Sequence, residues 1–258
     1  MKQILVIPKR EKISDYINLA QKYDLGFEYN DFFVPDILDE ENECERIVQA
    51  YKQELLPAYT TMHGAFFDVI PVSVDAKIRE ISRNRIEQSI EIAKRIGVKA
   101  VIFHTNYNPS LNSPEYVDQW IDTNADFWRN VLDRHADINI YLENMFETTP
   151  DVLKGISEQL QQYPNYGVCL DWAHVHVYGH SYETWIESLA PYIKHIHIND
   201  NDLITDLHLP LGTGKINWEQ FFTYYNNYFQ NCSILIEINS PSYQKHSLDY
   251  IKNKFHCI

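Results

Sequence analysis

Short apolar runs alternate with longer segments of helical periodicity along the whole chain. Each apolar run has the length of a strand, and the polar and apolar residues that follow it recur near the period of an α-helix. We expect strands at Gln3–Ile7, Gly26–Tyr29, Ala58–Met62, Ala100–Phe103, Asn139–Leu142, Tyr166–Leu170, Ile193–Ile198 and Ser233–Ile238. We expect helices near Ile13–Tyr23, Glu41–Leu55, Asp75–Ile96, Pro114–His135, Pro150–Gln162, Ser181–Leu189, Asn217–Phe229 and Ser247–Lys254.

The third helix has the clearest pattern. Isoleucines recur near helical spacing from Ile78 to Ile96, and Gly97 stands where a C-terminal capping glycine belongs. Regular alternation of strand and helix predicts parallel strands joined by helical crossovers. Eight such units in 258 residues match a (β/α)8 TIM barrel, which typically takes about 250 residues. A doubly wound open sheet is the alternative, and no linker divides residues 1–258, so we expect one domain.

A His or a carboxylate stands at the end of six successive predicted strands. The C-terminal ends of barrel strands meet at one rim, where the functional residues of TIM barrels lie. These side chains are therefore expected at one place, although any one of them alone would more often be a hydrogen-bonding residue. The six residues are His63, His104, Glu143, Asp171, His197 and Glu237.

Imidazole and carboxylate groups are the usual protein ligands of zinc, manganese and related ions. Polar groups buried in a barrel mouth are costly unless something satisfies them, and a metal ion does so. The sequence therefore predicts a divalent-metal site, with zinc or manganese as its ion. Glu143 and Glu237 would face each other across the mouth and are the candidate acid–base residues.

Further candidate ligands stand in the adjoining loops. His174 follows Asp171 by one turn of chain, and Asp206 and His208 point the same way if their segment is extended. Gly212 and Gly214 either let the backbone approach a ligand or make a turn before the next helix, and Lys215 would offer a cation to a substrate.

Other polar and aromatic residues near the strand ends are weaker candidates for the site. His195 shares the strand parity of His197 and is expected as a core histidine one layer deeper, while His176 lacks the spacing of His174 from Asp171. Glu28 is a candidate substrate or supporting residue, and Glu147 is read as a helix cap or surface residue. The candidate pocket walls for a sugar ring are Phe66, Phe67, Tyr107, Trp172 and Tyr178.

The composition of the chain disfavours some classes of binding partner. The net charge of −14 disfavours a general nucleic-acid binder and an anionic membrane surface, because both need clustered Lys and Arg. The four cysteines have no Cys-x-x-Cys spacing, which is typical of reduced thiols. The apolar opening at Ile4–Pro8 is too short for a signal peptide, and no run reaches the roughly 18 apolar residues of a membrane span, so we expect a cytoplasmic protein.

The motifs at the strand ends jointly resemble the xylose isomerase-like TIM-barrel superfamily, which includes sugar phosphate isomerases, epimerases and endonuclease IV. The pattern of candidate ligands is most similar to that of endonuclease IV, the abasic-site phosphodiesterase. The resemblance runs from about His63 to Asn239. It rests on Met62-His63-Gly64, Val101-Ile102-Phe103-His104, Leu142-Glu143-Asn144, residues 167–174 (Gly-Val-Cys-Leu-Asp-Trp-Ala-His), His197-Ile198-Asn199-Asp200, Asp206-Leu207-His208, Leu211-Gly212-Thr213-Gly214 and Leu235-Ile236-Glu237-Ile238-Asn239.

This resemblance implies up to three metal ions. Each ligand position of endonuclease IV has a matching residue here. The resemblance implies a first ion on His63, His104 and Glu143, a second on Glu143, Asp171, His197 and Glu237, and a third on His174, Asp206 and His208.

Two departures concern DNA binding. Leu207 stands where endonuclease IV has an arginine, and the loop after the second strand, residues 28–33, is acidic and aromatic rather than basic.

Two activities fit these residues. An isomerase or epimerase of a small sugar or sugar phosphate would use Glu143 and Glu237 to move a proton, and the acidic chain, the missing arginine and the aromatic loops favour it. A zinc-dependent phosphoesterase acting on abasic DNA or a small phosphoester is the alternative, favoured by the complete ligand set. A metal-stabilised binding protein without catalysis is a third class, and the sequence favours it least.

Overall fold

The computed structural model describes residues 3–53, 56–66 and 68–255, and its strands close into a parallel barrel in the order β1 to β8. Strand β1 pairs with both β2 and β8, which closes the ring. This confirms the predicted (β/α)8 TIM barrel and excludes an open sheet. The strands are β1 Ile4–Val6, β2 Leu25–Tyr29, β3 Thr60–His63, β4 Ala100–His104, β5 Asn139–Glu143, β6 Tyr166–Asp171, β7 Ile193–Ile198 and β8 Ser233–Ile236.

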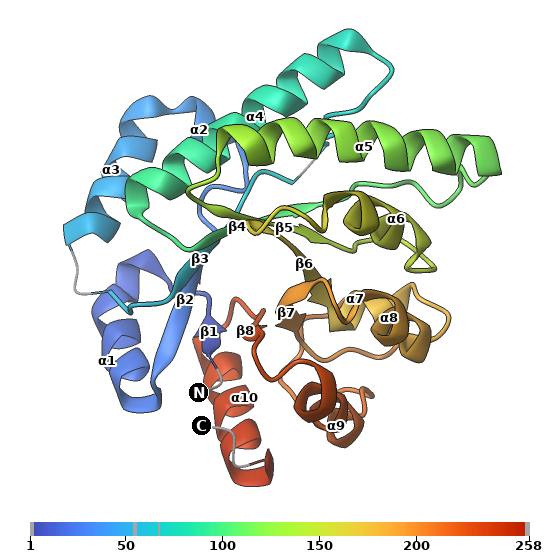
Figure 1. Cartoon of the computed structure of the whole chain (residues 1–258). Coiled ribbons are helices and arrows are strands. Elements are labelled where there is room, and N and C mark those ends of the chain that lie inside the picture. Colours follow the sequence, from blue (N-terminus) through green and yellow to red (C-terminus); the bar gives the residue numbers. More distant parts are fainter. Residues whose placement is uncertain (1–2, 54–55, 67, 256–258) are drawn as a thin grey trace.

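Helices surround the barrel on all sides (Figure 1). All eight predicted helical segments contain a helix. Two short helices, α2 (Pro35–Asp39) and α7 (Trp172–Val177), were not predicted. The first turn is a 3-10 helix, η1 Arg10–Lys12. The α-helices are α1 Ile13–Tyr23, α2 Pro35–Asp39, α3 Glu41–Gln53, α4 Ala76–Ile96, α5 Pro114–Arg134, α6 Asp151–Leu160, α7 Trp172–Val177, α8 Tyr182–Leu189, α9 Trp218–Tyr228 and α10 Pro241–Phe255.

Helix α4 begins and ends where its sequence predicts. The side chain of Asp75 accepts hydrogen bonds from the backbone N–H groups of Lys77 and Ile78, at 2.8 and 3.3 Å. Gly97 ends the helix in the left-handed conformation, with φ of +89°. The expected apolar stripe is buried only from its middle onward, because Ile78 and Ile81 are 45% and 61% exposed. The first turns of α4 therefore present apolar side chains to solvent.

Most predicted boundaries differ from the structure by one or two residues, and those of α10 and β8 are described here. Helix α10 starts at Pro241, earlier than the predicted Ser247, because proline suits the first turn of a helix. Strand β8 ends at Ile236 instead of Ile238, so Glu237 lies just beyond the last paired residue. The predicted end of the second helix at Leu55 lies outside the described residues.

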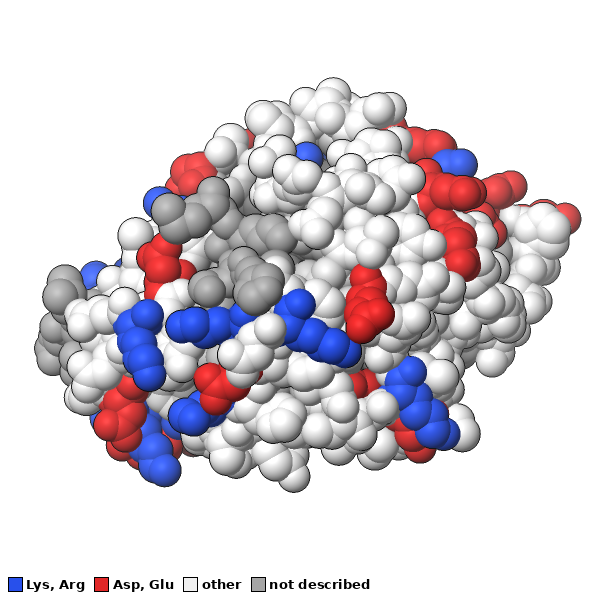
Figure 2. Space-filling view, turned by 90° about the horizontal axis from the view of Figure 1, so that it is seen from below, with Lys and Arg blue, Asp and Glu red and all other residues white. Residues whose placement is uncertain are grey.

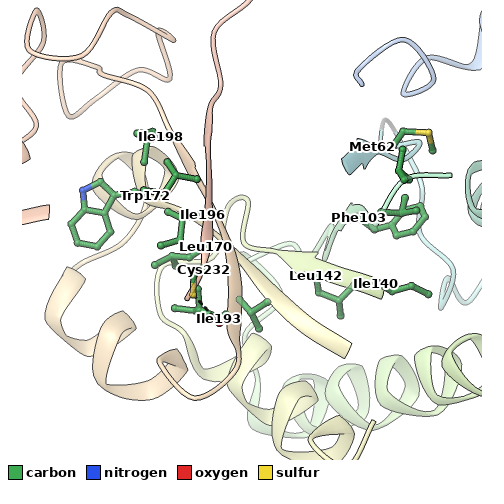
Figure 3. Packing of buried hydrophobic residues seen from close by; sticks show 14 of the residues in the cluster. Met62, Phe103, Ile140, Leu142, Leu170, Trp172, Ile193, Ile196, Ile198 and Cys232 are labelled. Carbon is green, nitrogen blue, oxygen red and sulfur yellow. Dashed lines mark hydrogen bonds between the residues drawn. The ribbon is translucent and has the colours of Figure 1, made fainter. Parts of the chain in front are cut away.

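Side chains on alternate sides of each strand fill two separate cores. Those that face the helices form the main apolar cluster, including Phe103, Leu142, Leu170 and Ile196 (Figure 3). Those that face the barrel axis are apolar at the bottom and polar toward the C-terminal ends of the strands. Because strand side chains alternate with a period of two, every predicted strand-end ligand falls on the inward face. The fold thus concentrates polar groups at one end of the barrel axis.

Two further expectations concern the whole chain. The described cysteines, Cys44, Cys169 and Cys232, are free and buried, and Cys257 lies outside the described residues. Among the described residues, no helix is long and apolar enough to cross a membrane.

Candidate metal centre

The C-terminal ends of β3, β4 and β5 bring His63, His104 and Glu143 together in the barrel mouth. The Nε2 atoms of His63 and His104 lie 3.5 and 3.3 Å from Oε2 of Glu143. One ligand atom from each residue lies within 4.8 Å of the other two. These three side chains form the first ligand group and can hold one divalent ion.

A second ligand group shares Glu143 with the first. The Nδ1 atom of His197 lies 3.2 Å from Oε1 of Glu143 and 3.7 Å from Oε2 of Glu237, and Asp171 completes the group within 4.8 Å. Glu143 therefore turns its two carboxylate oxygens toward different ligand groups. In this position Glu143 would be able to contribute one oxygen to an ion in each group.

His174, Asp206 and His208 form a third ligand group beside the other two. The Nε2 atoms of His174 and His208 lie 3.4 and 3.0 Å from the same oxygen, Oδ2 of Asp206. The fold thus brings together all nine side chains that the sequence analysis named as ligands.

Backbone carbonyls fix the rings of three of these histidines. The Nδ1 atoms of His63, His174 and His208 lie 2.8, 2.9 and 2.7 Å from the carbonyl oxygens of Gly64, Asn144 and Glu237. A ring that donates its Nδ1–H to a carbonyl keeps the Nε2 lone pair for a metal ion. The three rings are therefore held in the tautomer that a metal site requires.

The ring of His197 is turned the opposite way. Its Nε2 lies 3.3 Å from Oε1 of Glu28, so its Nδ1 faces Glu143 and Glu237. Glu28 is completely buried, and its other oxygen lies 2.7 Å from Oγ1 of Thr61 and 3.2 Å from Nε2 of His195. A carboxylate behind a ligand histidine orients the ring and raises its basicity. Glu28 occupies that position for His197.

One layer deeper, His195 is the buried, hydrogen-bonded histidine that its strand parity predicted. Its Nδ1 lies 2.6 Å from Oγ of Ser233. Cys169 lies within 4.8 Å of His195 and His197. Burial raises the pKa of its thiol well above the usual value.

Several buried polar atoms of the ligand groups have no hydrogen-bond partner among the described residues. They include both carboxylate oxygens of Glu143, Oδ2 of Asp171, Nδ1 of His197 and Oε2 of Glu237. Buried polar atoms are almost always paired, because leaving them unpaired costs free energy. The other oxygen of Asp171 accepts the backbone N–H of His174, so only Oδ2 faces the site. These unpaired atoms lie close together in the barrel mouth, an arrangement that suits bound cations.

The pKa values of these groups follow from burial and crowding. Burial raises the pKa of Glu143, but the adjacent His197 and His104 outweigh it and hold the pKa well below its usual value. Burial, together with Glu237 and Glu143, raises the pKa of Asp171 well above normal. Burial lowers the pKa of His208, but Glu237 and Asp206 raise it to about 10. These shifts follow from carboxylates and imidazoles that lie close together in one buried site.

Sequence reasoning missed two residues that shape the site. The side-chain amide of Asn144 exchanges hydrogen bonds with the backbone of Asp171, at 2.9 and 3.0 Å. The buried carboxylate of Asp200 accepts from the N–H groups of Gly212 and Ile216 and from the indole of Trp218, at 2.8, 3.2 and 2.9 Å. Both residues stand in the segments that carry the family resemblance, Asn144 next to Glu143 and Asp200 three residues after His197, and that was the available signal.

Asp200 explains the two glycines of the loop that follows the third ligand group. Gly212 has φ of +82°, and a Cβ at Gly214 would lie 2.3 Å from Oδ1 of Asp200. The loop is wrapped around this carboxylate, which supports the interpretation of the glycines as a turn. Lys215 is exposed on the same loop.

Glu147 was read as a cap or surface residue, and the surface interpretation is wrong. Its side chain is only 3% exposed and accepts hydrogen bonds from Thr105 Oγ1 and from the backbone N–H of Met145. Burial raises its pKa. The chain folds back at this loop, which brings Glu147 against β4 instead of into solvent.

The candidate pocket walls lie in different environments. Phe66 is half-buried, and its ring centroid lies 4.8 Å from that of His104 and 5.3 Å from that of Phe33. Trp172 is 1% exposed and packs against Phe221 in the core. Tyr107 is also buried, Tyr178 packs near His174, and Phe67 lies outside the described residues. Phe66 is thus the aromatic side chain that borders the first ligand group.

A family model described as the xylose isomerase-like TIM barrel matches residues 19–254. The chain belongs to this family. Two curated relatives are the uncharacterized protein MJ1311 of Methanocaldococcus jannaschii and a probable endonuclease 4 of Protochlamydia amoebophila. They are 29% and 26% identical over 181 and 166 residues, which are 65% and 54% of this chain. The matches span 61% and 56% of those relatives, somewhat less than two thirds of their length.

Solved structures of the family superpose over nearly the whole chain. The TTHB071 protein from Thermus thermophilus, soaked with ZnCl2, has a TM-score of 0.78 at 21% identity, covering 98% of this chain and 97% of its own. A D-tagatose 3-epimerase-like protein has a TM-score of 0.75 at 22% identity, covering 98% and 96%. At these identities the likeness establishes the shared fold.

Proposed function

We propose that this barrel is a divalent-metal enzyme that hydrolyses a small phosphoester, with up to three ions on its nine ligand residues. The observation that carries the proposal is the position of Glu143, whose two oxygens face separate ligand groups. A sugar isomerase that uses one ion leaves no role for the first and third groups. The sequence favoured an isomerase, and the assembled geometry moves the preference to hydrolysis.

Some side chains would bind the ions, and others would hold the ligand side chains in position. Divalent ions bound there would supply positive charge to phosphoryl oxygens and lower the pKa of an attacking water. Glu143 would keep two ions at a fixed separation. Asp171 and Glu237 would neutralise the second ion, while Asp206 would do so for the third. Glu28 would hold the ring of His197 from behind.

The surface favours a small substrate over duplex DNA. The chain carries a net charge of −14, and Leu207 stands between Asp206 and His208 where endonuclease IV has an arginine. On the face drawn in Figure 2, acidic side chains gather toward one end, and a short row of basic side chains with acidic neighbours crosses the middle. A DNA backbone needs many contacts from clustered Lys and Arg, which the net charge of −14 disfavours.

An isomerase or epimerase of a small sugar or sugar phosphate is the second candidate. Glu143 and Glu237 lie on either side of Nδ1 of His197, a suitable arrangement for moving a proton between adjacent carbons of a chelated sugar. The structural likeness to the D-tagatose 3-epimerase-like protein over the whole chain supports it. Both candidates require metal and a small sugar-like substrate.

A substrate panel separates these activities. We expect zinc- or manganese-loaded protein to release phosphate from small phosphoesters such as sugar phosphates, and to lose this activity with a chelator. Phosphate release and ketose–aldose interconversion are measured on the same preparations. Interconversion without phosphate release would establish the isomerase, and rapid chelator-sensitive cleavage of abasic duplex DNA would overturn the preference for a small substrate.

His208→Ala and His174→Ala are each expected to lower the metal content by about one ion per chain. Each substitution removes one of the three ligands of the third group and leaves the first two groups intact. Elemental analysis of the purified proteins measures the stoichiometry. His246→Ala, which removes an exposed histidine from α10, is the control. A third ion that remains in both variants would show that this group holds none.

Glu28→Gln is expected to weaken binding of the second ion by about 10- to 100-fold, the usual effect of losing a supporting carboxylate. The amide keeps the size of the side chain but removes the charge behind His197. Competition with a chromophoric chelator measures the affinity. Thr61→Val, which removes a hydrogen bond to the Glu28 carboxylate but keeps its charge behind His197, is the matched control. Affinity equal to that of the parent would show that Glu28 does not support this ligand.

A further inference from the structure

The arginines of this acidic chain divide into two kinds. Six form ion pairs with carboxylates, and the remaining two, Arg79 and Arg83, have no carboxylate partner among the described residues. The two lie one turn apart on α4. The paired arginines are Arg10, Arg46, Arg85, Arg95, Arg129 and Arg134.

Both unpaired arginines line the same cavity. It has a volume of about 580 Å³ and lies between the first turns of α4 and α5 and the loops that follow β3 and β4. Because these loops leave the C-terminal ends of the strands, the cavity lies on the side of the barrel that carries the ligand groups. Its volume is within the range of pockets that bind small molecules, roughly 300 to 1,000 Å³. None of the nine ligand residues lines it.

Backbone contacts hold each guanidinium in place. Arg79 donates through one nitrogen to the carbonyl oxygens of Ser73 and Val74, and Nε of Arg83 donates to that of Pro71 at 2.9 Å. Among the described residues the remaining N–H groups have no hydrogen-bond partner, and the guanidinium carbon of Arg83 also lies 5.2 Å from the ring centroid of Phe127. Burial lowers the pKa of Arg83, and the positive charge of Arg79 lowers it further. Two fixed cations that repel each other are a ready site for an anion with several acceptor oxygens.

The other walls are aromatic and amide groups. Tyr116 and Trp120 on α5 stack with ring centroids 6.1 Å apart and an interplanar angle of 26°. Asn106 and Asn108 from the loop after β4 add amides to the lining, and Leu111 at the rim is 47% exposed. An aromatic wall next to two guanidinium groups suits a ligand that has both a ring and an anionic group.

We propose that this cavity is a second binding site, which takes a small organic phosphate: Arg79 and Arg83 bind the phosphate, and Tyr116 and Trp120 pack against the ring. Arginine forks match phosphate geometry, and a phosphate dianion would balance the two unpaired charges. The site is separate from the proposed metal centre and does not depend on which reaction occurs there.

Calorimetric titration of the metal-loaded protein with phenylphosphonate, an analogue of an organic phosphate that has no phosphoester bond to hydrolyse, and with inorganic phosphate tests the site. We expect the double variant R79Q/R83Q to bind phenylphosphonate at least about tenfold more weakly than the parent, because charged hydrogen bonds are lost. R46Q/R129Q removes the same charge from paired arginines outside the cavity and should bind as the parent does. Equal affinity in R79Q/R83Q and the parent would overturn the proposal.

Phosphate would also bind to metal ions, so the titration is repeated after chelation. The tenfold difference between the parent and R79Q/R83Q should persist, and the metal content of the variant before chelation should equal that of the parent. Disappearance of the difference on chelation would assign the binding to the metal centre and overturn the second site. The parent should prefer phenylphosphonate over phosphate, and Tyr116→Leu should reduce that preference. No preference in the parent would exclude the aromatic wall from the site.

Discussion

Replacing Glu143 with glutamine is expected to lower activity by at least about a hundredfold and to remove about two metal ions per chain. Glu143 faces His63 and His104 with one oxygen and His197 with the other. An amide has one oxygen and a neutral charge, so it cannot bridge two cations. The loss is expected to exceed the 10- to 100-fold effect of removing a supporting residue, because a shared ligand is lost.

The control for this variant is Glu147→Gln. Glu147 is also a buried glutamate beyond β5, and it hydrogen-bonds Thr105 and the backbone of Met145 without belonging to a ligand group. Its variant should keep the parental metal content. Elemental analysis and phosphoesterase assays on the two variants are directly comparable. Full metal content in Glu143→Gln would contradict the bridging role.

Removing the metal ions is expected to lower the thermal unfolding midpoint by at least about 10 °C. A ligand present at 1,000 times its Kd stabilises a fold by about 4 kcal/mol. For a domain of this size each kcal/mol shifts the midpoint by roughly 2 to 4 °C. Two occupied sites therefore reach the expected shift, and the unpaired buried atoms of Glu143 and Asp171 would then lack a cation.

Scanning calorimetry with and without chelator measures this shift, and added zinc should restore the midpoint. Glu143→Gln should show a smaller response to chelator than the parent. An unchanged midpoint in the parent after complete removal of the metal would show that the ligand groups are stable without ions, against the role assigned to their unpaired atoms.

The sequence predicted the strand-end residues of the site well, because the geometry of a barrel determines where they lie. Once eight strands alternate with helices, the residue that ends each strand must lie at the same rim, and the inward parity follows from the period of two. His63, His104 and Glu143 were found in this way, and the structure brings them together. The spacing of Asp206 and His208 made them candidates, but the family resemblance was needed to group them with His174, because no periodicity fixes a loop.

The sequence did not predict contacts between segments that are far apart along the chain. Glu147 was misplaced because a loop residue that folds back onto β4 looks, in sequence, like any exposed carboxylate. The role of Asp200 depends on the loop with Gly212 and Gly214, which wraps around its carboxylate only in the folded chain. The short helix α7 was missed because its six residues cannot show a helical period.

Geometry also changed the functional conclusion. From the sequence, the acidic composition and the aromatic loops favoured a sugar isomerase. The structure adds the orientation of rings and oxygens: three histidines present Nε2, His197 presents Nδ1, and Glu143 faces two ways. These orientations favour a site built for more than one ion, which is the requirement of the phosphoesterase mechanism.

The most direct test of the bridging site is a crystal structure of the zinc-loaded protein with anomalous data collected at the zinc edge. We predict two anomalous peaks on opposite sides of the Glu143 carboxylate, one beside His63 and His104 and one beside Asp171, His197 and Glu237. A third peak is expected between His174, Asp206 and His208. A single peak on the second group, with His63 and His104 free of metal at saturating zinc, would contradict the bridging site.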